Sequence, residues 1–132
     1  MTATHLQKVL IVDDERLFIY PLKDVIESAG YEVESAMSGR EALEKVRKSP
    51  PDIVVLDLMM PEMNGFEVAR EIRGDERFKH IPIVMLTGFI SEDAAENHLA
   101  DIDEILTKPI TSGKLLTSIR THLSKPPQST QQ

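Results

Sequence analysis

Ile53-Val54-Val55-Leu56-Asp57 is the stretch that decides the fold: four apolar residues followed directly by a carboxylate. Apolar runs of this length without polar alternation are typical of strands buried on both faces of a parallel sheet. The carboxyl ends of such strands share one sheet edge, where ligands bind. Three further runs also stop at reactive side chains: Lys8–Val12 before Asp13 and Asp14, Ile83–Leu86 before Thr87, and the weaker Ile105–Leu106 shortly before Lys108.

Segments with helical spacing separate these runs. The first carries an apolar stripe and ends at Gly30, a residue type that favours a helix C-terminus. A second begins at a capping-box pattern, Ser38 to Glu41, and stops at Pro50. The stripe comprises Leu17, Val25, Ile26 and Ala29; the remaining expected elements are a strand at Tyr31–Ala36 and helices at Phe66–Gly74, at Ser91–Leu99 and from Thr111 or Ser112 to Leu123, the last packing through Leu115, Leu116, Ile119 and Leu123.

This alternation of strands and helices predicts an α/β fold in which helices cover both faces of a parallel sheet. Right-handed crossovers and a doubly wound order place the first and third strands side by side at the switch point. We therefore expect a three-layer α/β/α sandwich with a five-stranded parallel sheet of order 2-1-3-4-5, the flavodoxin-like arrangement. In it, Asp13, Asp14 and Asp57 meet through topology.

Composition limits the function classes. The 132 residues fit one domain at 8–124, with an N-terminal tail at 1–7 and a polar, proline-bearing segment at 125–132 that we expect to be a disordered tail or the start of a linker. The absence of Cys excludes disulfides and thiolate metal sites. A net charge of −7 argues against direct nucleic-acid binding. No membrane span or signal peptide is recognisable, so a cytoplasmic location is expected.

Three carboxylates in one pocket cannot all ionise without cost. Two unit charges about 4 Å apart repel by ~4 kcal/mol at an effective dielectric near 20. Either one carboxylate takes up a proton or a divalent cation lies among them. Oxygen ligands without His or Cys favour Mg²⁺ or Mn²⁺. With the Thr87 hydroxyl and the Lys108 ammonium, the set has the parts needed to hold a phosphoryl group on a carboxylate.

Taken singly, these residues have ordinary structural interpretations. Asp13 or Asp14 alone would most simply cap the first helix. Asp57 or Thr87 alone would be an ordinary residue at a strand end, and Lys108 a solvated charge. Other residues that invite a functional reading have plainer ones: Met59, Met60 and Met63 are typical gap-filling apolar residues, and the four His residues show no ligand spacing.

The ordered set of motifs resembles the receiver domain of two-component response regulators over about Lys8 to Ser124. The resemblance rests on four segments, each at a predicted strand end: Val12-Asp13-Asp14-Glu15, Leu56-Asp57-Leu58-Met59-Met60-Pro61-Glu62-Met63-Asn64-Gly65, Leu86-Thr87-Gly88 and Leu106-Thr107-Lys108-Pro109.

The resemblance implies a regulatory phosphoacceptor rather than a conventional turnover enzyme. A sensor histidine kinase or histidine phosphotransfer protein would phosphorylate Asp57, and phosphorylation would switch the interaction with a downstream protein or domain. The resemblance further implies a role for each site residue: Asp14, Asp57 and the main-chain carbonyl of Met59 bind Mg²⁺ directly and Asp13 binds it through water, Thr87 and Lys108 hold the phosphoryl group, and the Lys108–Pro109 bond is cis.

The sequence departs from the family pattern at several positions. Ile105 stands where most receivers carry a switch aromatic, so the usual coupling of Thr to an aromatic ring is in doubt. The stretch from Ser91 to Glu104 is unusual, so the face formed by the fourth helix, fifth strand and fifth helix is expected to be an atypical partner surface. Met59 and Phe89, which would flank the phosphoryl group, are apolar and bulky, so autodephosphorylation is expected to be slow.

Two alternative functions stay open. The chain could be a degenerate receiver that binds partners without phosphorylation; Ile105 favours this, whereas the intact acidic set, Thr87 and Lys108 oppose it. A phosphatase of the haloacid dehalogenase type also forms an aspartyl phosphate, but it needs a second acid two residues after the nucleophile, where this chain has Met59.

Overall fold

The computed structural model describes residues 6–88 and 99–124. The order of elements is β1 (Lys8–Val12), α1 (Arg16–Ser28), β2 (Glu32–Ala36), α2 (Gly39–Lys48), β3 (Ile53–Asp57), α3 (Gly65–Arg73), β4 (Ile83–Thr87), the 3-10 turn η1 (Leu99–Asp101), β5 (Glu104–Thr107) and α5 (Ser112–Ser124). The expected helix at Ser91–Leu99 falls almost entirely outside the described residues.

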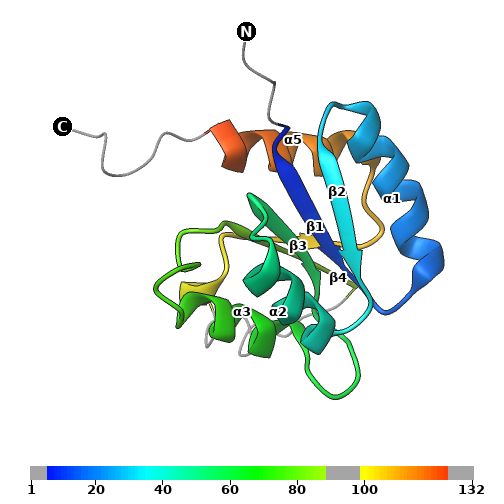
Figure 1. The fold of residues 1–132 in the computed structure, drawn as a ribbon. Helices are drawn as coiled ribbons and strands as arrows, with labels where there is room; N and C mark the ends of the chain where they lie inside the picture. The colour runs from blue at the N-terminus through cyan, green and yellow to red at the C-terminus, as the bar shows by residue number, and fades with distance from the viewer. Residues whose placement is uncertain (1–5, 89–98, 125–132) are drawn as a thin grey trace, which may run out of the picture.

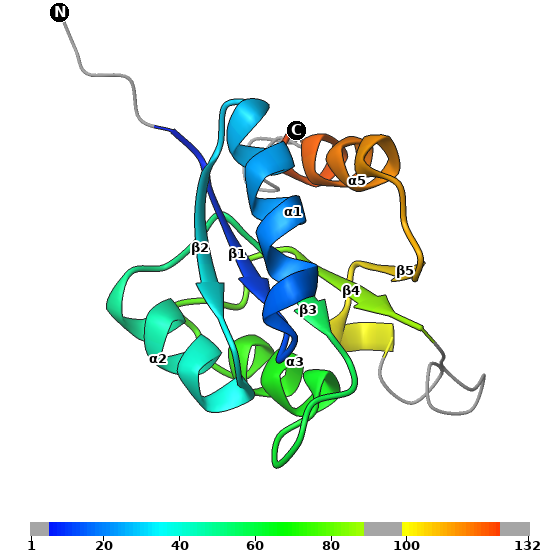
Figure 2. The same cartoon turned by 90° about the vertical axis from the view of Figure 1, so that its right-hand side faces the viewer.

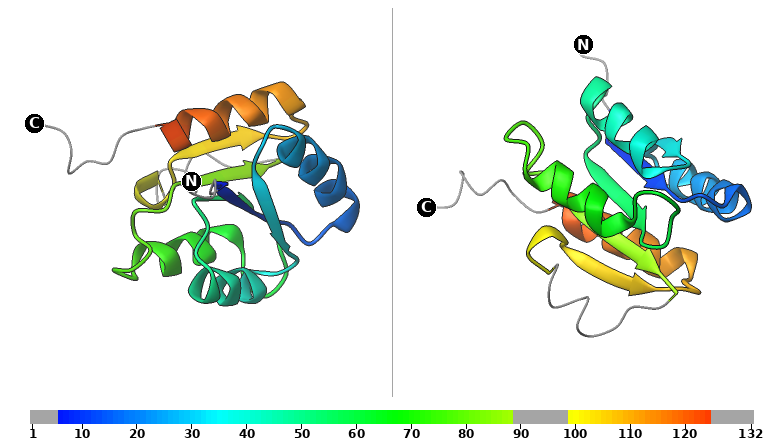
Figure 3. Two further views of the ribbon diagram at one scale, coloured as in Figure 1. Left: turned by 45° about the horizontal axis from the view of Figure 1, so that its top comes forward. Right: turned by 90° about the horizontal axis from the view of Figure 1, so that it is seen from below.

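The five strands form one parallel sheet in the order β2-β1-β3-β4-β5. Helices α1 and α5 cover one face, and α2 and α3 cover the other (Figures 1 and 2). Figure 3 shows the strands as the middle layer, with β2 and β5 at the outer edges. The predicted α/β/α sandwich and its strand order are confirmed.

The strand sequences explain why both sheet faces are covered. Every residue of β1, β3 and β4 is buried, and successive side chains point to opposite faces. Within β1, Leu10 and Val12 pack into the core on the α2–α3 side, whereas Val9 and Ile11 pack into the core on the α1–α5 side. A strand with apolar residues on both faces is stable only between two layers of helices, so these runs require the sandwich.

The predicted apolar stripe of α1 is confirmed at Ile26, which is buried, and is wrong at Leu17 and Ala29, which are exposed. Leu17 is 86% exposed, and the buried residues of the helix are Ile19, Leu22 and Ile26. These three lie three and four residues apart and so share one helix face, whereas Leu17 lies two residues before Ile19 and points the opposite way. The stop at Gly30 is confirmed: its φ is +102°, and its N–H donates to the carbonyl of Glu27.

The helix starts agree with the sequence in part. The Ser38 hydroxyl accepts from Glu41 N–H at 3.1 Å as predicted, but the Glu41 carboxylate accepts from Met37 N–H, so the capping box is incomplete. A complete capping box, which was not predicted, joins Asn64 and Glu67 at the start of α3. Thr111 caps α5 as expected, accepting from Lys114 N–H at 3.1 Å.

No helix within residues 6–88 and 99–124 has the length and apolar character that a membrane span requires.

Candidate functional site

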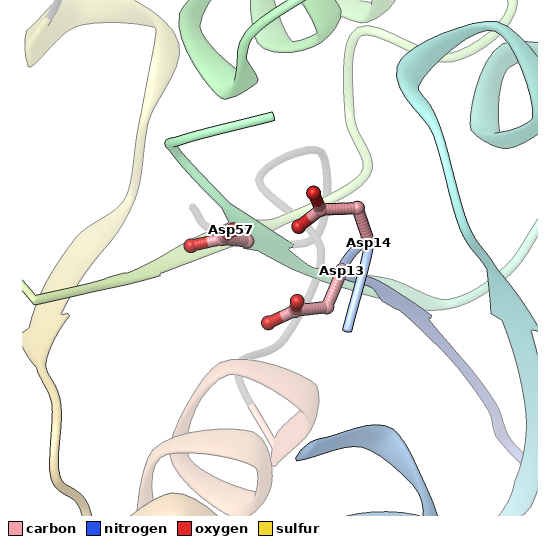
Figure 4. A group of neighbouring side chains, drawn as sticks. All are labelled: Asp13, Asp14 and Asp57. Carbon is pink, nitrogen blue, oxygen red and sulfur yellow. The ribbon is translucent and has the colours of Figure 1, made fainter. Parts of the chain in front are cut away.

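The acidic residues at the ends of β1 and β3 converge as predicted. The two strands are neighbours, with Val12 paired to Leu56, so Asp13 and Asp14 follow β1 beside the end of β3. Carboxylate oxygens of Asp13, Asp14 and Asp57 lie within 4.8 Å of one another, and Figure 4 shows the three side chains gathered at this edge of the sheet. Asp13 and Asp57 are buried, and Asp14 is exposed.

Lys108 reaches this cluster from the loop between β5 and α5. Its ammonium Nζ lies 3.1 Å from Oδ2 of Asp13 and 3.4 Å from Oδ1 of Asp57. Its backbone N–H donates to the carbonyl of Thr87 at 2.8 Å, which holds the loop against the end of β4. The peptide bond between Lys108 and Pro109 is cis, as predicted.

The burial and the charges of the cluster shift the pKa of Asp57. Burial and, after it, the negative charge of Asp13 raise the pKa of its carboxyl, Lys108 opposes the shift, and the net pKa is about 6. For Lys108, burial lowers the pKa, but the hydrogen bond to Asp13 and the charge of Asp57 outweigh burial and raise it. The fold therefore disfavours the ionised form of Asp57, because the attraction of Lys108 offsets only part of the cost of burial and of the repulsion from Asp13.

The donor set fits a hard divalent cation. Three carboxylates carry three negative charges when ionised, and Lys108 neutralises only one of them. Their oxygen atoms are ligands that suit Mg²⁺ or Mn²⁺, and the exposed Asp14 leaves the cluster open to solvent. A cation bound here would relieve the repulsion between the carboxylates.

Thr87 ends β4 beside the acidic cluster. In the sheet register, Asp57 pairs with Leu86, so Thr87 follows directly beyond the end of β3, and its side chain is buried. The structure therefore brings Thr87 to the same sheet edge as Asp57 and Lys108.

The remaining candidate residues are Ile105, Met59 and Phe89. Ile105 is partly buried and packs against the core on the α2–α3 side. The side chain of Met59 is 69% exposed, so its interpretation as a gap-filling core residue is wrong, whereas Met60 is buried. The difference arises because Met59 lies in the loop after β3, beyond the last strand residue. Phe89 lies outside the described residues.

The interpretation of Asp13 as the cap of the first helix is wrong, because the N-cap residue of α1 is Glu15. Asp13 instead holds the turn that precedes the helix. Its Oδ1 accepts from the N–H of Glu15 at 2.9 Å, which orders the turn into α1, while its Oδ2 accepts from Lys108. The turn therefore fixes the carboxylate in the orientation that faces the site.

Several contacts were not predicted. The ammonium of Lys108 lies 4.0 Å from the centroid of the Phe18 ring. The buried side chain of His122, interpreted as incidental, contacts the carboxylate of Glu104 at 2.9 Å, and the Ser118 hydroxyl donates to the same carboxylate at 2.6 Å. The hydrogen bond from Ser118 is the main reason that the pKa of Glu104 is lowered. None of these three pairs is close in sequence, so no spacing pattern revealed them.

Comparison with known proteins agrees with this geometry. A family model described as the response regulator receiver domain matches residues 9–120. The polar-differentiation response regulator DivK of Brucella ovis is 32% identical over 118 residues, which cover 89% of this chain and 96% of DivK.

Solved structures are similar over a comparable share of the chain. The chemotaxis protein CheY4 of Vibrio cholerae aligns with a TM-score of 0.85 at 36% identity, over 90% of this chain and 100% of that one. A CheY-like receiver domain protein of Methanospirillum hungatei also aligns with a TM-score of 0.85, at 28% identity over 90% of this chain and 94% of that one.

Proposed function

The chain belongs to the response regulator receiver domain family, and from that premise we propose that it is a phosphorylation-controlled switch with Asp57 as the acceptor. The observation that carries the proposal is the convergence of Asp57 with Asp13, Asp14 and Lys108 at the carboxyl edge of the sheet. A buried carboxylate beside an ammonium and two further acids is suited to accept a phosphoryl group. The family is a regulatory phosphoacceptor family rather than a class of conventional enzymes.

The proposed transfer uses the Asp57 carboxylate as the nucleophile. One of its oxygens forms a bond to phosphorus, the bond from phosphorus to the donor's imidazole nitrogen breaks, and the electron pair leaves with the imidazole, which retains or takes up a proton. A pKa of about 6 leaves Asp57 mostly ionised at neutral pH. We propose that Lys108 then pairs with the phosphoryl oxygens and that the Thr87 hydroxyl donates to one of them.

The metal site is proposed to use the same acids. Asp14, Asp57 and the main-chain carbonyl of Met59 would bind Mg²⁺ or Mn²⁺ directly, and Asp13 would bind through water. The support is the cluster of carboxylate oxygens within 4.8 Å. When bound, the cation would stabilise negative charge on the phosphoryl oxygens.

The proposed partners are a sensor histidine kinase or histidine phosphotransfer protein upstream and an output protein or domain downstream, in the cytoplasm. The output face is proposed to include β5 and α5 together with the segment before η1. In its described part, the carboxylate of Glu104 on β5 accepts from Ser118 and contacts His122, both on α5, and the side chains of Ser118 and His122 are buried. We propose no direct contact with nucleic acid or membrane.

The acceptor role is tested with a small phosphodonor, such as acetyl phosphate, and Mg²⁺. We expect the wild type to gain one phosphoryl mass by intact mass spectrometry and Asp57→Asn to gain none, because the amide cannot act as the nucleophile. Size-exclusion chromatography of both forms would show whether phosphorylation changes assembly. A wild type that gains no mass, with donors that phosphorylate other receivers, would instead favour the degenerate receiver that Ile105 suggests.

The lifetime of the phosphoryl group is a separate expectation. Met59 has no group that can orient an attacking water, and the same holds for Phe89, so autodephosphorylation is proposed to be slow. We expect Met59→Asn combined with Phe89→Ala to speed the decay about tenfold, which corresponds to about 1.4 kcal/mol of barrier. The decay is measured by mass spectrometry after removal of the donor. An unchanged rate would show that these side chains do not shield the site.

A further inference from the structure

The ring of Phe18 lies against the charged group of the site. Phe18 is in the first turn of α1 and is partly buried, packing against the core between the sheet and the α1–α5 layer. The Nζ of Lys108 lies 4.0 Å from the centroid of its ring, well within the range of a cation–π contact. A residue of α1 therefore contacts the ammonium of Lys108, which belongs to the loop after β5.

The ring and two carboxylates together surround the ammonium. The carboxylates of Asp13 and Asp57 approach Nζ at 3.1 and 3.4 Å, and the side chain of Lys108 is only 21% exposed. The lysine side chain is a flexible four-carbon stem, so two ionic contacts alone leave the ammonium free to turn toward solvent. The face of Phe18 closes one side of that space.

Backbone contacts fix the ring relative to the acidic cluster. The N–H of Phe18 donates to the carbonyl of Glu15 at 3.0 Å, and the N–H of Glu15 donates to Oδ1 of Asp13 at 2.9 Å. The turn that orients Asp13 therefore also orients Phe18. Asp13 and the ring therefore approach Lys108 from the same hydrogen-bonded turn.

We propose that Phe18 is a positioning residue for the phosphoryl-transfer site: its ring holds the ammonium of Lys108 beside Asp57. The inference rests on the function proposed above. A ring face attracts a cation without fixing its direction, unlike a hydrogen-bond acceptor. The ammonium can therefore move from Asp13 toward an arriving phosphoryl group and stay over the ring throughout.

The first test compares rates of phosphorylation by acetyl phosphate with Mg²⁺. Phe18→Leu keeps apolar bulk but removes the π face, and we expect it to react about fivefold more slowly than the wild type, while Phe18→Tyr reacts at nearly the wild-type rate. The matched control is Tyr20→Leu, which removes an exposed ring from the same helix and leaves the rate unchanged.

A double-mutant cycle separates positioning from a general effect on the fold. In the Lys108→Met background there is no ammonium to hold, so adding Phe18→Leu is expected to cause no further loss. A fivefold loss that persists in that background would overturn the proposal, and so would a Phe18→Leu variant that reacts as fast as the wild type.

A measurement on the wild type does not depend on any variant folding. The ε-methylene protons of Lys108 are expected to show an upfield ring-current shift by NMR in the unphosphorylated protein, and ordinary shifts would overturn the proposed contact. The failures are distinguishable: a wild type that gains no phosphoryl group overturns the function itself, whereas a phosphorylated wild type with a fast Phe18→Leu variant overturns only the role of Phe18.

Discussion

Gly65→Ala is expected to lower the free energy of unfolding by about 3 kcal/mol, because a methyl group at this position would collide with the backbone of the site. A Cβ on Gly65 would lie 2.6 Å from the carbonyl oxygen of Asp57 and 2.9 Å from Cα of Leu58. Both are backbone atoms at the end of β3, and they can yield only if the strand end that carries Asp57 moves. The variant is therefore also expected to accept a phosphoryl group more slowly.

Chemical denaturation of Gly65→Ala and of a second helix variant would measure this effect. Gly113→Ala is the matched control, because Gly113 lies in the first turn of α5 and a Cβ there meets nothing within 4 Å. Alanine is favoured over glycine in a helix by up to about 1 kcal/mol, so the control is expected to be neutral or stabilising. Equal stabilities for the two variants would show that β3 and α3 do not pack as closely as this geometry requires.

The sheet and the acidic edge could be predicted because their signals are local. The run before Asp57 is apolar throughout, which indicates a strand with both faces covered, and the topological rule of a doubly wound sheet with right-handed crossovers then places it beside Lys8–Val12. The meeting of Asp13, Asp14 and Asp57 follows from that order. A few local signals and one topological rule were therefore sufficient for the core of the site.

What the sequence did not reveal depends on side-chain direction and on contacts between distant segments. The stripe through Leu17 failed because several helical faces of α1 carry apolar residues and only packing selects the buried one. Phe18 reads as an ordinary core residue until Lys108, 90 positions later, is placed over its ring. The His residues show no metal-ligand spacing, and the contact of His122 with Glu104, a carboxylate on another element, has no signal in the local sequence.

Asp57→Asn is expected to raise the free energy of unfolding by about 2–3 kcal/mol at neutral pH in the absence of divalent cations, although it destroys the acceptor. The native pKa of Asp57 is about 6, above the value near 3.8 expected for the unfolded chain. Burial and the charge of Asp13 thus make the ionised carboxylate costly in the folded protein. An uncharged amide of nearly the same shape removes that cost.

The direction of the pH dependence follows from the raised pKa. Below about pH 4 the carboxyl is protonated in both states, so wild type and Asp57→Asn are expected to be equally stable. Between about pH 4 and 6 the unfolded chain releases a proton that the native protein retains, so the wild type loses stability relative to the variant, and the full difference is present at pH 7 and above. Denaturation in EDTA at a series of pH values measures this difference, in which other titrating groups cancel.

Mg²⁺ is expected to stabilise the wild type more than the variant, because the amide has lost the charge that attracts the cation. A stability difference that is constant from pH 4 to 8 would contradict the raised pKa, and an equal response to Mg²⁺ would show that Asp57 is not among the ligands.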